Sequence, residues 1–289
     1  MVKYYFNLIS LCFLLSQISC QNSTAREQKT SVNPKKPISN SLFLERDTTI
    51  FIDGRKVTIQ YPTVNPIGTI LCLPGWNFSN TDVCDKSTFC NEAKKNGFVL
   101  VFPDMGKSIY ASKLYPETRK DWTRYPQLKF ITDTLIPELQ KTYSLLKPQS
   151  NNFLYGISTG ARGVAMIALH TGTLFKAGAA LSGDYEQTRM FTDNLMIGYY
   201  GPFSKYKDRW EDDDPYFKSS EIKIPLYLAH GGSDKVVPTE QTKIFYEQLK
   251  KVNKTLGHQL HIDDGAGHNY EFWGKETETV LSFFKERIK

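Results

Sequence analysis

The chain has 289 residues, of which 40% are hydrophobic, 13% aromatic and 23% charged. This composition is that of a globular protein, and it excludes wholesale disorder, collagen and coiled coil. The formal net charge of +6 comes from 36 basic and 30 acidic residues that are scattered along the chain. Because there is no basic run of the kind that binds nucleic acid, we expect no nucleic-acid partner.

The first twenty residues have the pattern of a secretion signal. Lys3 is the only charged residue before Cys20, and it precedes a mostly apolar run over residues 4–18. A short positive start, an apolar run and a small residue together indicate a signal peptide. A membrane-spanning helix is disfavoured, because a span needs about 20 predominantly apolar residues and four polar residues interrupt this run. We therefore expect export.

The signal ends in Gln17-Ile18-Ser19-Cys20, which resembles the lipobox of bacterial lipoproteins. In those proteins the cysteine becomes the lipid-modified first residue of the mature chain, although most boxes have leucine where this chain has Gln17. The resemblance implies lipidation of Cys20, with membrane contact only through that anchor. The alternative is simple cleavage near Ser19, which would leave a soluble secreted protein.

Residues 21–41 are polar and rich in Ser, Asn, Lys and Pro, which predicts a flexible tether. One folded domain is expected over residues 42–289. Within it, Cys84 and Cys90 are close enough in sequence to pair, and export would allow a disulfide to persist. Cys72 lies in an apolar run and is expected to be a buried free thiol. No Cys or His spacing is typical of a metal site, so we expect no metal.

The domain alternates short apolar runs with amphipathic stretches. The runs predict strands over residues 48–52, 56–61, 69–73, 98–102, 152–156, 177–181, 225–229 and 258–262. Asp53-Gly54 joins the first two as a hairpin signal, and the later, continuously apolar runs are typical of strands covered on both faces. Helical periods fall at residues 128–139, where Pro137 is expected to cause a kink, at 244–249 and at 273–288. This order predicts an α/β fold with a mostly parallel, eight-stranded sheet covered by helices on both faces.

A G-x-S-x-G motif, Gly156 to Gly160, lies between a predicted strand and a predicted helix. Ser158 at such a turn is exposed, and flanking glycines let the strand and helix approach each other closely. The positive N-terminus of the helix would point at an oxyanion formed beside it. Ser158 is thus the candidate nucleophile; the alternative is an ordinary helix cap.

A serine nucleophile needs a base to accept its proton and a carboxylate to orient that base. His268 lies in a loop just after the last predicted strand, which suits a general base. The other histidines lie in a helix or in strands and are interpreted as structural: His170, His230, His258 and His261.

For the acid we select Asp234, which follows the strand at 225–229 and preserves the chain order serine, acid, histidine. Asp184 is the main rival, since it follows the preceding strand. Asp263 and Asp264 come too soon before His268, and residues 212–214 are interpreted as a solvated charge run.

Two backbone amides are needed to bind the oxyanion. The candidates are Thr159, directly after the nucleophile, and Trp76, in a loop after the third strand where Gly75 lets the backbone turn. Trp76 can also serve as a pocket wall. His230-Gly231-Gly232 is similar to an oxyanion motif of some lipases, but it follows the wrong strand.

Together these segments resemble the α/β-hydrolase superfamily, with Gly156 to Gly160 as nucleophile elbow and residues 230–238 as acid loop. Residues 130–143, 177–185 and 267–273 are similar to the esterase group that includes feruloyl esterases and S-formylglutathione hydrolases. The acid loop also resembles dienelactone-hydrolase and prolyl-oligopeptidase relatives. The oxyanion loop has Pro74-Gly75 where many relatives have His-Gly, and Thr159 stands where Met or Gln is frequent, but neither change removes a backbone donor.

Together with the predicted export, the resemblance implies a serine esterase that forms an acyl-enzyme, needs no cofactor and acts on a small-molecule or carbohydrate-linked ester. A serine peptidase of the prolyl-oligopeptidase type is the alternative, and a non-catalytic binding protein is a lesser one. Residues 183–224 form an aromatic-rich insertion between the sixth and seventh strands that would either cap the serine or pack on the body. As substrate-binding residues we expect Gly75, Trp76, Tyr185 and Trp210.

Overall fold

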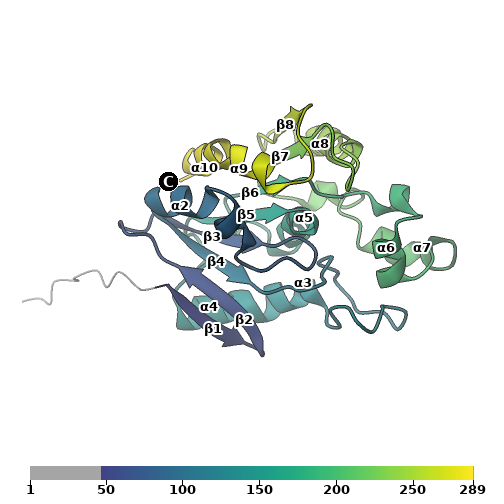
Figure 1. Ribbon diagram of the computed structural model, residues 1–289, viewed down its shortest axis with the longest axis horizontal. Helices are drawn as coiled ribbons and strands as arrows, with labels where there is room; N and C mark the ends of the chain where they lie inside the picture. Colours follow the sequence, from purple (N-terminus) through teal and green to yellow (C-terminus); the bar gives the residue numbers. More distant parts are fainter. Residues whose placement is uncertain (1–46, 289) are drawn as a thin grey trace, which may run out of the picture. The chain divides into compact units, whose positions relative to one another are not determined.

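The computed structural model describes residues 47–288 (Figure 1). The predicted signal, the lipidation site at Cys20 and the predicted tether lie outside the described residues. The strands are β1 Thr48–Ile52, β2 Arg55–Gln60, β3 Gly68–Leu73, β4 Phe98–Pro103, β5 Asn152–Ile157, β6 Ala177–Leu181, β7 Leu226–Gly231 and β8 Gln259–Asp263. The α-helices are α1 Asp82–Lys86, α2 Phe89–Lys95, α3 Gln127–Lys129, α4 Ile136–Thr142, α5 Thr159–Thr171, α6 Asn194–Tyr200, α7 Phe203–Asp212, α8 Glu240–Val252, α9 Tyr270–Lys275 and α10 Thr277–Lys285. None of the helices described is long and apolar enough to cross a membrane.

The strands form one sheet in the order β1-β2-β4-β3-β5-β6-β7-β8. β1, β2 and β4 pair antiparallel, and β3 to β8 pair parallel with their neighbours. All eight predicted strands are confirmed, with ends that differ by no more than two residues. At the first turn, Asp53 and Gly54 both have positive φ, +48° and +72°, as a two-residue hairpin turn requires.

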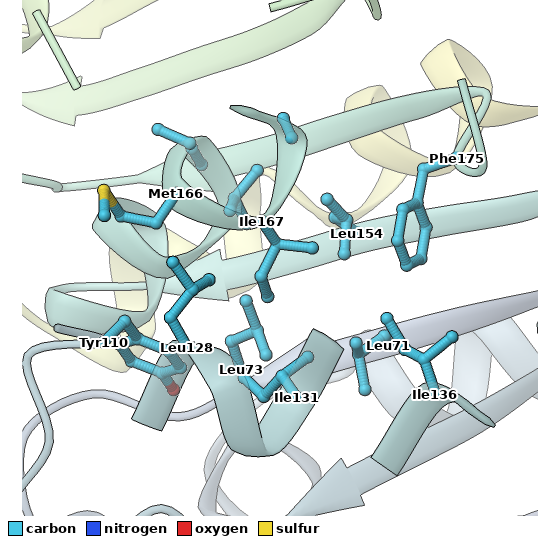
Figure 2. Packing of buried hydrophobic residues seen from close by; sticks show 14 of the residues in the cluster. Leu71, Leu73, Tyr110, Leu128, Ile131, Ile136, Leu154, Met166, Ile167 and Phe175 are labelled. Carbon is cyan, nitrogen blue, oxygen red and sulfur yellow. The ribbon is translucent and has the colours of Figure 1, made fainter. Parts of the chain in front are cut away.

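Helices cover both faces of the sheet (Figure 1). On one face, side chains of α4, α5 and α8 join those of the strands in a core that includes Leu71, Leu154 and Ile167 (Figure 2). On the other face, α2, α9 and α10 supply a second core with Phe153 and Phe284. Each fully buried side chain of this size stabilises the fold by about 1.5–3 kcal/mol. The predicted α/β fold class is therefore confirmed.

Two of the expected helices are not continuous, and the first is interrupted at Pro137, where a kink was expected. Before Pro137 the helix widens into a π-helical stretch, η1 Phe130–Leu135, and α4 starts directly after it. Pro137 has no N–H to donate and its ring crowds the preceding turn, which explains the widening. The expected final helix is divided at Glu276 into α9 and α10.

Cys84 and Cys90 form a disulfide between α1 and α2. Cys72 is a buried free cysteine, as expected, and burial raises the pKa of its thiol well above the ordinary value. Cys72 therefore stays a neutral thiol inside the sheet.

The insertion between β6 and β7 is also confirmed. It contains η2 Gln187–Met190, α6, α7 and η3 Ser219–Glu221. Large side chains of α6 and α7 build a small core of their own with residues of the loop before α3: Ile109, Ala111, Met196, Tyr199, Tyr200 and Trp210. The insertion and the loop before α3 thus share a small apolar cluster.

Candidate active site

Ser158 lies at the turn between β5 and α5 with φ +55° and ψ −127°. Such a conformation is strained for a residue with a side chain, and it turns the hydroxyl away from the sheet. A Cβ at Gly156 would lie 2.1 Å from the carbonyl oxygen of Gly160, and a Cβ at Gly160 would lie 2.1 Å from that of Leu73. Both glycines of the motif are therefore required by close backbone approach.

The loops after β7 and β8 are held together by their backbones. The amide of Gly232 donates to the Asp263 carbonyl at 2.7 Å, and the amide of Ser233 donates to the Ala266 carbonyl at 2.9 Å. A Cβ at Gly231 would lie 2.4 Å from the Ala266 oxygen. These two backbone hydrogen bonds fix the acid loop against the loop that carries His268.

The fold brings three predicted residues into one hydrogen-bonded chain. Ser158 Oγ lies 2.9 Å from His268 Nε2, although 110 residues separate them in sequence. His268 Nδ1 lies 2.6 Å from Asp234 Oδ2. The His268 and Trp273 rings pack in a T-shaped arrangement, with ring centroids 5.1 Å apart. This geometry lets the imidazole accept the serine proton while the carboxylate holds its Nδ1–H.

The Asp234 carboxylate is surrounded by donors. Oδ1 accepts the amides of Val236 at 2.7 Å and Val237 at 2.9 Å. Burial pushes the pKa of Asp234 upward, but hydrogen bonds from His230, His268 and the Val237 amide outweigh burial, and the pKa lies well below its usual value. The carboxylate therefore remains charged throughout the neutral and mildly acidic range.

The two amides expected to bind an oxyanion are both available. Thr159 is the first residue of α5, and Trp76 follows Gly75 in the loop after β3. Within residues 47–288 neither amide donates to another group of the protein. The Tyr110 hydroxyl donates to the Pro74 carbonyl at 2.8 Å, which braces this loop beside the nucleophile.

The rival residues have other partners. His170 and His261 are exposed and contact the Met166 carbonyl and Glu276, each at 2.8 Å. His258 accepts a backbone amide at 3.1 Å through Nδ1. Asp184 is buried against Arg162, with 3.8 Å between Arg162 Nε and Asp184 Oδ2. The acid position beside His268 is thus occupied by Asp234 and not by Asp184.

A pocket of about 350 Å³ opens over the serine. Its walls come from the oxyanion loop, the insertion and the acid loop, and most of its surface is apolar. It is lined by Trp76, Phe78, Ser158, Thr159, Asp184, Met190, Asp193, Leu195, Met196, Val236, Val237 and His268. This volume and lining suit one small apolar group.

The prediction of two substrate-binding residues, Tyr185 and Trp210, is wrong. Tyr185 is fully buried and stacks on Phe245 of α8, with ring centroids 4.4 Å apart. Trp210 is fully buried in the core of the insertion, where its indole N–H donates to the Gly201 carbonyl. Neither side chain reaches the pocket, because each fills an apolar interior instead. Gly75 is buried beside Ser158, and the Trp76 side chain lines the pocket.

Comparison with known proteins identifies the family. Residues 90–289 match the model of the prolyl oligopeptidase family, and this range contains Ser158, Asp234 and His268. The chain belongs to the prolyl oligopeptidase family. It is a serine hydrolase with the α/β-hydrolase fold. A search of curated protein sequences gave no significant match.

Solved structures similar to this prolyl oligopeptidase family member include esterases and peptidases. S-formylglutathione hydrolase from Agrobacterium tumefaciens has a TM-score of 0.66 at 17% identity, over 81% of this chain and 90% of that one. The fluorophosphonate-binding serine hydrolase F of Staphylococcus aureus has a TM-score of 0.64 at 18% identity, over 80% and 92%. Acylaminoacyl peptidase from Pyrococcus horikoshii has a TM-score of 0.63 at 17% identity, over 84% of this chain but only 41% of the peptidase. At these identities the likeness establishes the fold.

The pocket wall includes residues that could not be identified as site residues from the sequence. Met190, Leu195 and Met196 come from the insertion, and Val236 and Val237 follow Asp234 in the acid loop. The position of the two valines in the sequence could have indicated a place in the pocket wall, because they closely follow a candidate catalytic residue at the same sheet edge. Nothing in the sequence indicates this for the residues of the insertion, since their position depends on how α6 and α7 pack.

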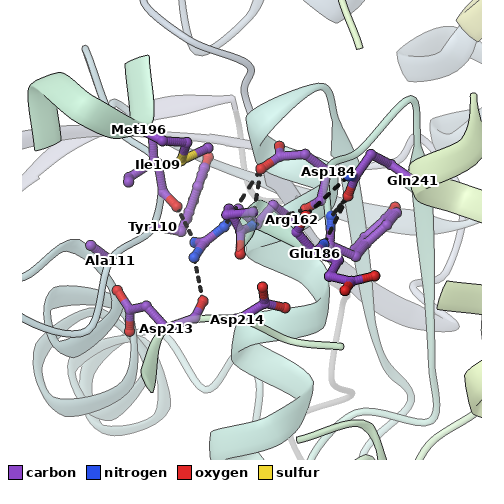
Figure 3. A network of polar contacts seen from close by, with 12 residues as sticks. Ile109, Tyr110, Ala111, Arg162, Asp184, Glu186, Met196, Asp213, Asp214 and Gln241 are labelled. Carbon is purple, nitrogen blue, oxygen red and sulfur yellow. Dashed lines mark hydrogen bonds and ion pairs between the residues drawn. The ribbon is translucent and has the colours of Figure 1, made fainter. Parts of the chain in front are cut away.

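A buried arginine ties this insertion to the nucleophile helix (Figure 3). Arg162, four residues after Ser158, donates to the carbonyls of Ile109 and Asp213 and to the Tyr200 hydroxyl. Its side chain is fully buried, and the Asp184 carboxylate faces its Nε. Burial raises the pKa of Asp184, and the Arg162 charge partly offsets that rise. One guanidinium thus holds three segments of the pocket region together.

Replacing Arg162 by methionine is expected to lower the free energy of unfolding by about 3–5 kcal/mol, because buried carboxylates would lose their cation. Thermal and denaturant unfolding would measure the loss. Arg189→Met is the matched control: its pair with Glu186 involves an arginine side chain that is 58% exposed, so less than about 1 kcal/mol is expected. Equal losses in the two variants would contradict this role of Arg162.

The lowered pKa of Asp234 also predicts the pH dependence of turnover. The carboxylate keeps its charge as the pH falls through the mildly acidic range, so protonation of Asp234 should not contribute to the acid limb. Where log kcat/KM falls with decreasing pH, we expect a slope of about one and not two. A profile from pH 4 to 8 measures this slope, and a slope near two would mean that the Asp234 carboxylate also titrates in this range.

Proposed function

We propose that this serine hydrolase cleaves carboxylic esters through an acyl-enzyme, with Ser158 as nucleophile, His268 as general base and acid, and Asp234 as the orienting carboxylate. The observation that carries the proposal is the hydrogen-bonded chain Ser158–His268–Asp234, which opens on an apolar pocket.

In the first step Ser158 Oγ attacks the ester carbonyl carbon while its proton passes to His268 Nε2. The carbonyl oxygen becomes an oxyanion that the amides of Trp76 and Thr159 bind. When the intermediate collapses, the C–O bond to the alcohol breaks and the alcohol oxygen takes the proton from His268. Water then attacks the acyl-enzyme by the same route and releases the acid.

The pocket supports an apolar acyl group. Its polar side chains are Ser158, Thr159, Asp184, Asp193 and His268, and the remaining lining is aromatic, Met, Leu and Val. Two of the five are carboxylic acids, of which Asp184 is paired with the buried Arg162, whereas no Lys or Arg lines the pocket. A neutral or cationic acyl group therefore suits it better than an anionic one. We propose a carbohydrate as the alcohol component of the ester, because of the resemblance to feruloyl esterases and the predicted export.

A peptidase is the second candidate, because the family is that of prolyl oligopeptidase. A panel of esters with acetyl, butyryl, octanoyl, feruloyl and succinyl groups, together with peptide anilides, separates the two. We expect turnover of the neutral esters, with succinyl the poorest. Peptide turnover above ester turnover would make the protein a peptidase, and no turnover of either class would refute the proposed function.

We further propose that the protein is exported and lipid-anchored at Cys20. The Cys84–Cys90 disulfide supports an oxidising compartment. In cells fed a labelled fatty acid, the wild-type protein should be labelled and should partition into detergent, whereas Cys20→Ser should do neither. A mature N-terminus that begins after Cys20 in mass analysis would contradict the anchor.

A further inference from the structure

His230 lies at the end of β7, behind the acid loop, and is fully buried. Its Nε2 is 3.0 Å from the Val237 carbonyl oxygen and 3.2 Å from Asp234 Oδ2. Its Nδ1 is 2.6 Å from the hydroxyl of Thr242, a buried residue of α8. The imidazole thus touches the carboxylate that contacts His268.

The partners fix the position of the ring proton. A backbone carbonyl can only accept, so His230 Nε2 must carry hydrogen, and that hydrogen is shared between Val237 and Asp234. In the neutral ring Nδ1 is then an acceptor, and the Thr242 hydroxyl donates to it. The Val237 carbonyl therefore selects the tautomer that presents a donor to Asp234, and the Thr242 hydroxyl supplies the hydrogen bond to the other ring nitrogen.

Each oxygen of Asp234 is held on more than one side. Oδ1 accepts two backbone amides, from Val236 and Val237, while Oδ2 lies between His268 Nδ1 and His230 Nε2. Without His230, Oδ2 would keep a single side-chain donor, and a buried polar oxygen would lose part of its hydrogen bonding. The carboxylate could then rotate about its side-chain bond away from the line to His268.

We propose that His230 is a positioning residue, which orients the Asp234 carboxylate toward His268, and that the Val237 carbonyl fixes the tautomer in which it does so. The inference rests on the proposed function, because it extends the chain from Ser158 through His268 and Asp234 to α8. It also gives a role to His230-Gly231-Gly232: the histidine supports the acid, while Gly231 and Gly232 admit the backbone of the loop that carries His268.

The test compares His230→Leu, which removes the donor, with His230→Gln, whose amide nitrogen can take the place of Nε2. For His230→Leu we expect kcat to fall about ten- to a hundred-fold with little change in KM, the range for a hydrogen bond to a charged group. His230→Gln should remain within about three-fold of wild type. Titration with a fluorophosphonate measures the concentration of active sites, so that kcat is calculated per active site and is not lowered by misfolded protein.

His258→Leu is the matched control. His258 is also a buried histidine beside the same strands, but its contact is to the Leu226 amide and not to the acid loop. We expect a loss of stability there without a fall in kcat per titrated site. An equal fall in kcat for His258→Leu and His230→Leu, or no rescue by His230→Gln, would overturn the inference.

A second readout needs no substrate. The short bond between His268 Nδ1 and Asp234 should give a far-downfield proton resonance, identified by its loss in His268→Gln. The resonance should persist in His230→Gln and shift or broaden in His230→Leu. An unchanged resonance in His230→Leu would refute the positioning role even if no substrate is turned over, whereas absence of turnover by wild type with the expected resonance change would refute only the proposed function.

Discussion

Ser158→Ala is expected to abolish both ester turnover and labelling by fluorophosphonates. The hydroxyl is the group that His268 Nε2 contacts at 2.9 Å, and no acyl-enzyme can form without it. From nucleophile removal in other serine hydrolases we expect kcat to fall about 10⁵- to 10⁶-fold. Turnover of a p-nitrophenyl ester and gel detection of the fluorophosphonate adduct measure the two effects.

Ser282→Ala is a suitable control for this experiment, because Ser282 is an exposed residue of α10, away from the pocket. It should keep full turnover and labelling. If Ser158→Ala still reacts with fluorophosphonate, another side chain is the nucleophile and the proposed mechanism is wrong.

The strands and the nucleophile turn could be predicted because their signals are local. A strand covered on both faces must be apolar throughout, so 152–156 and 177–181 stand out in the sequence. The turn at Ser158 needs glycine at 156 because a Cβ there would meet the Gly160 backbone, and glycine at 160 because a Cβ there would meet the Leu73 carbonyl of β3. The two glycines leave a short pattern that can be read in the sequence, although the contact that requires the second one is distant along the chain.

The pocket wall could not be predicted in the same way. Tyr185 and Trp210 are large aromatic residues in an insertion above the sheet, which suggested contact with substrate. The insertion, however, buries apolar side chains against the loop before α3, and Trp210 is part of that cluster. Composition alone does not tell which aromatic rings face inward and which face a cavity, because this choice follows from tertiary packing.

The choice between Asp234 and Asp184 was likewise open in the sequence, since each follows a strand end of the same sheet edge. The structure separates them through contacts distant in sequence. Arg162, 22 residues before Asp184, faces that carboxylate in a buried site. The backbone hydrogen bonds between the loops after β7 and β8 place His268 beside Asp234. Replacing each of the two acids is therefore expected to have a different effect on kcat.

Asp234→Asn should lower kcat about 10³- to 10⁴-fold, whereas Asp184→Asn should leave kcat within about ten-fold of wild type. An amide at 234 can donate to His268 Nδ1 and so favour the tautomer with hydrogen on Nε2. That nitrogen could then no longer accept the Ser158 proton. Asparagine at 184 cannot have this effect, because Asp184 contacts Arg162 and Gln187 and not His268.

Steady-state kinetics of both variants, normalised to folded protein by circular dichroism, measure the contrast. Because Asp184 lines the pocket, its replacement is expected to act mainly on KM. The opposite pattern, with kcat lost in Asp184→Asn and kept in Asp234→Asn, would move the acid to the preceding strand. It would also require His268 to turn away from the carboxylate that it contacts at 2.6 Å.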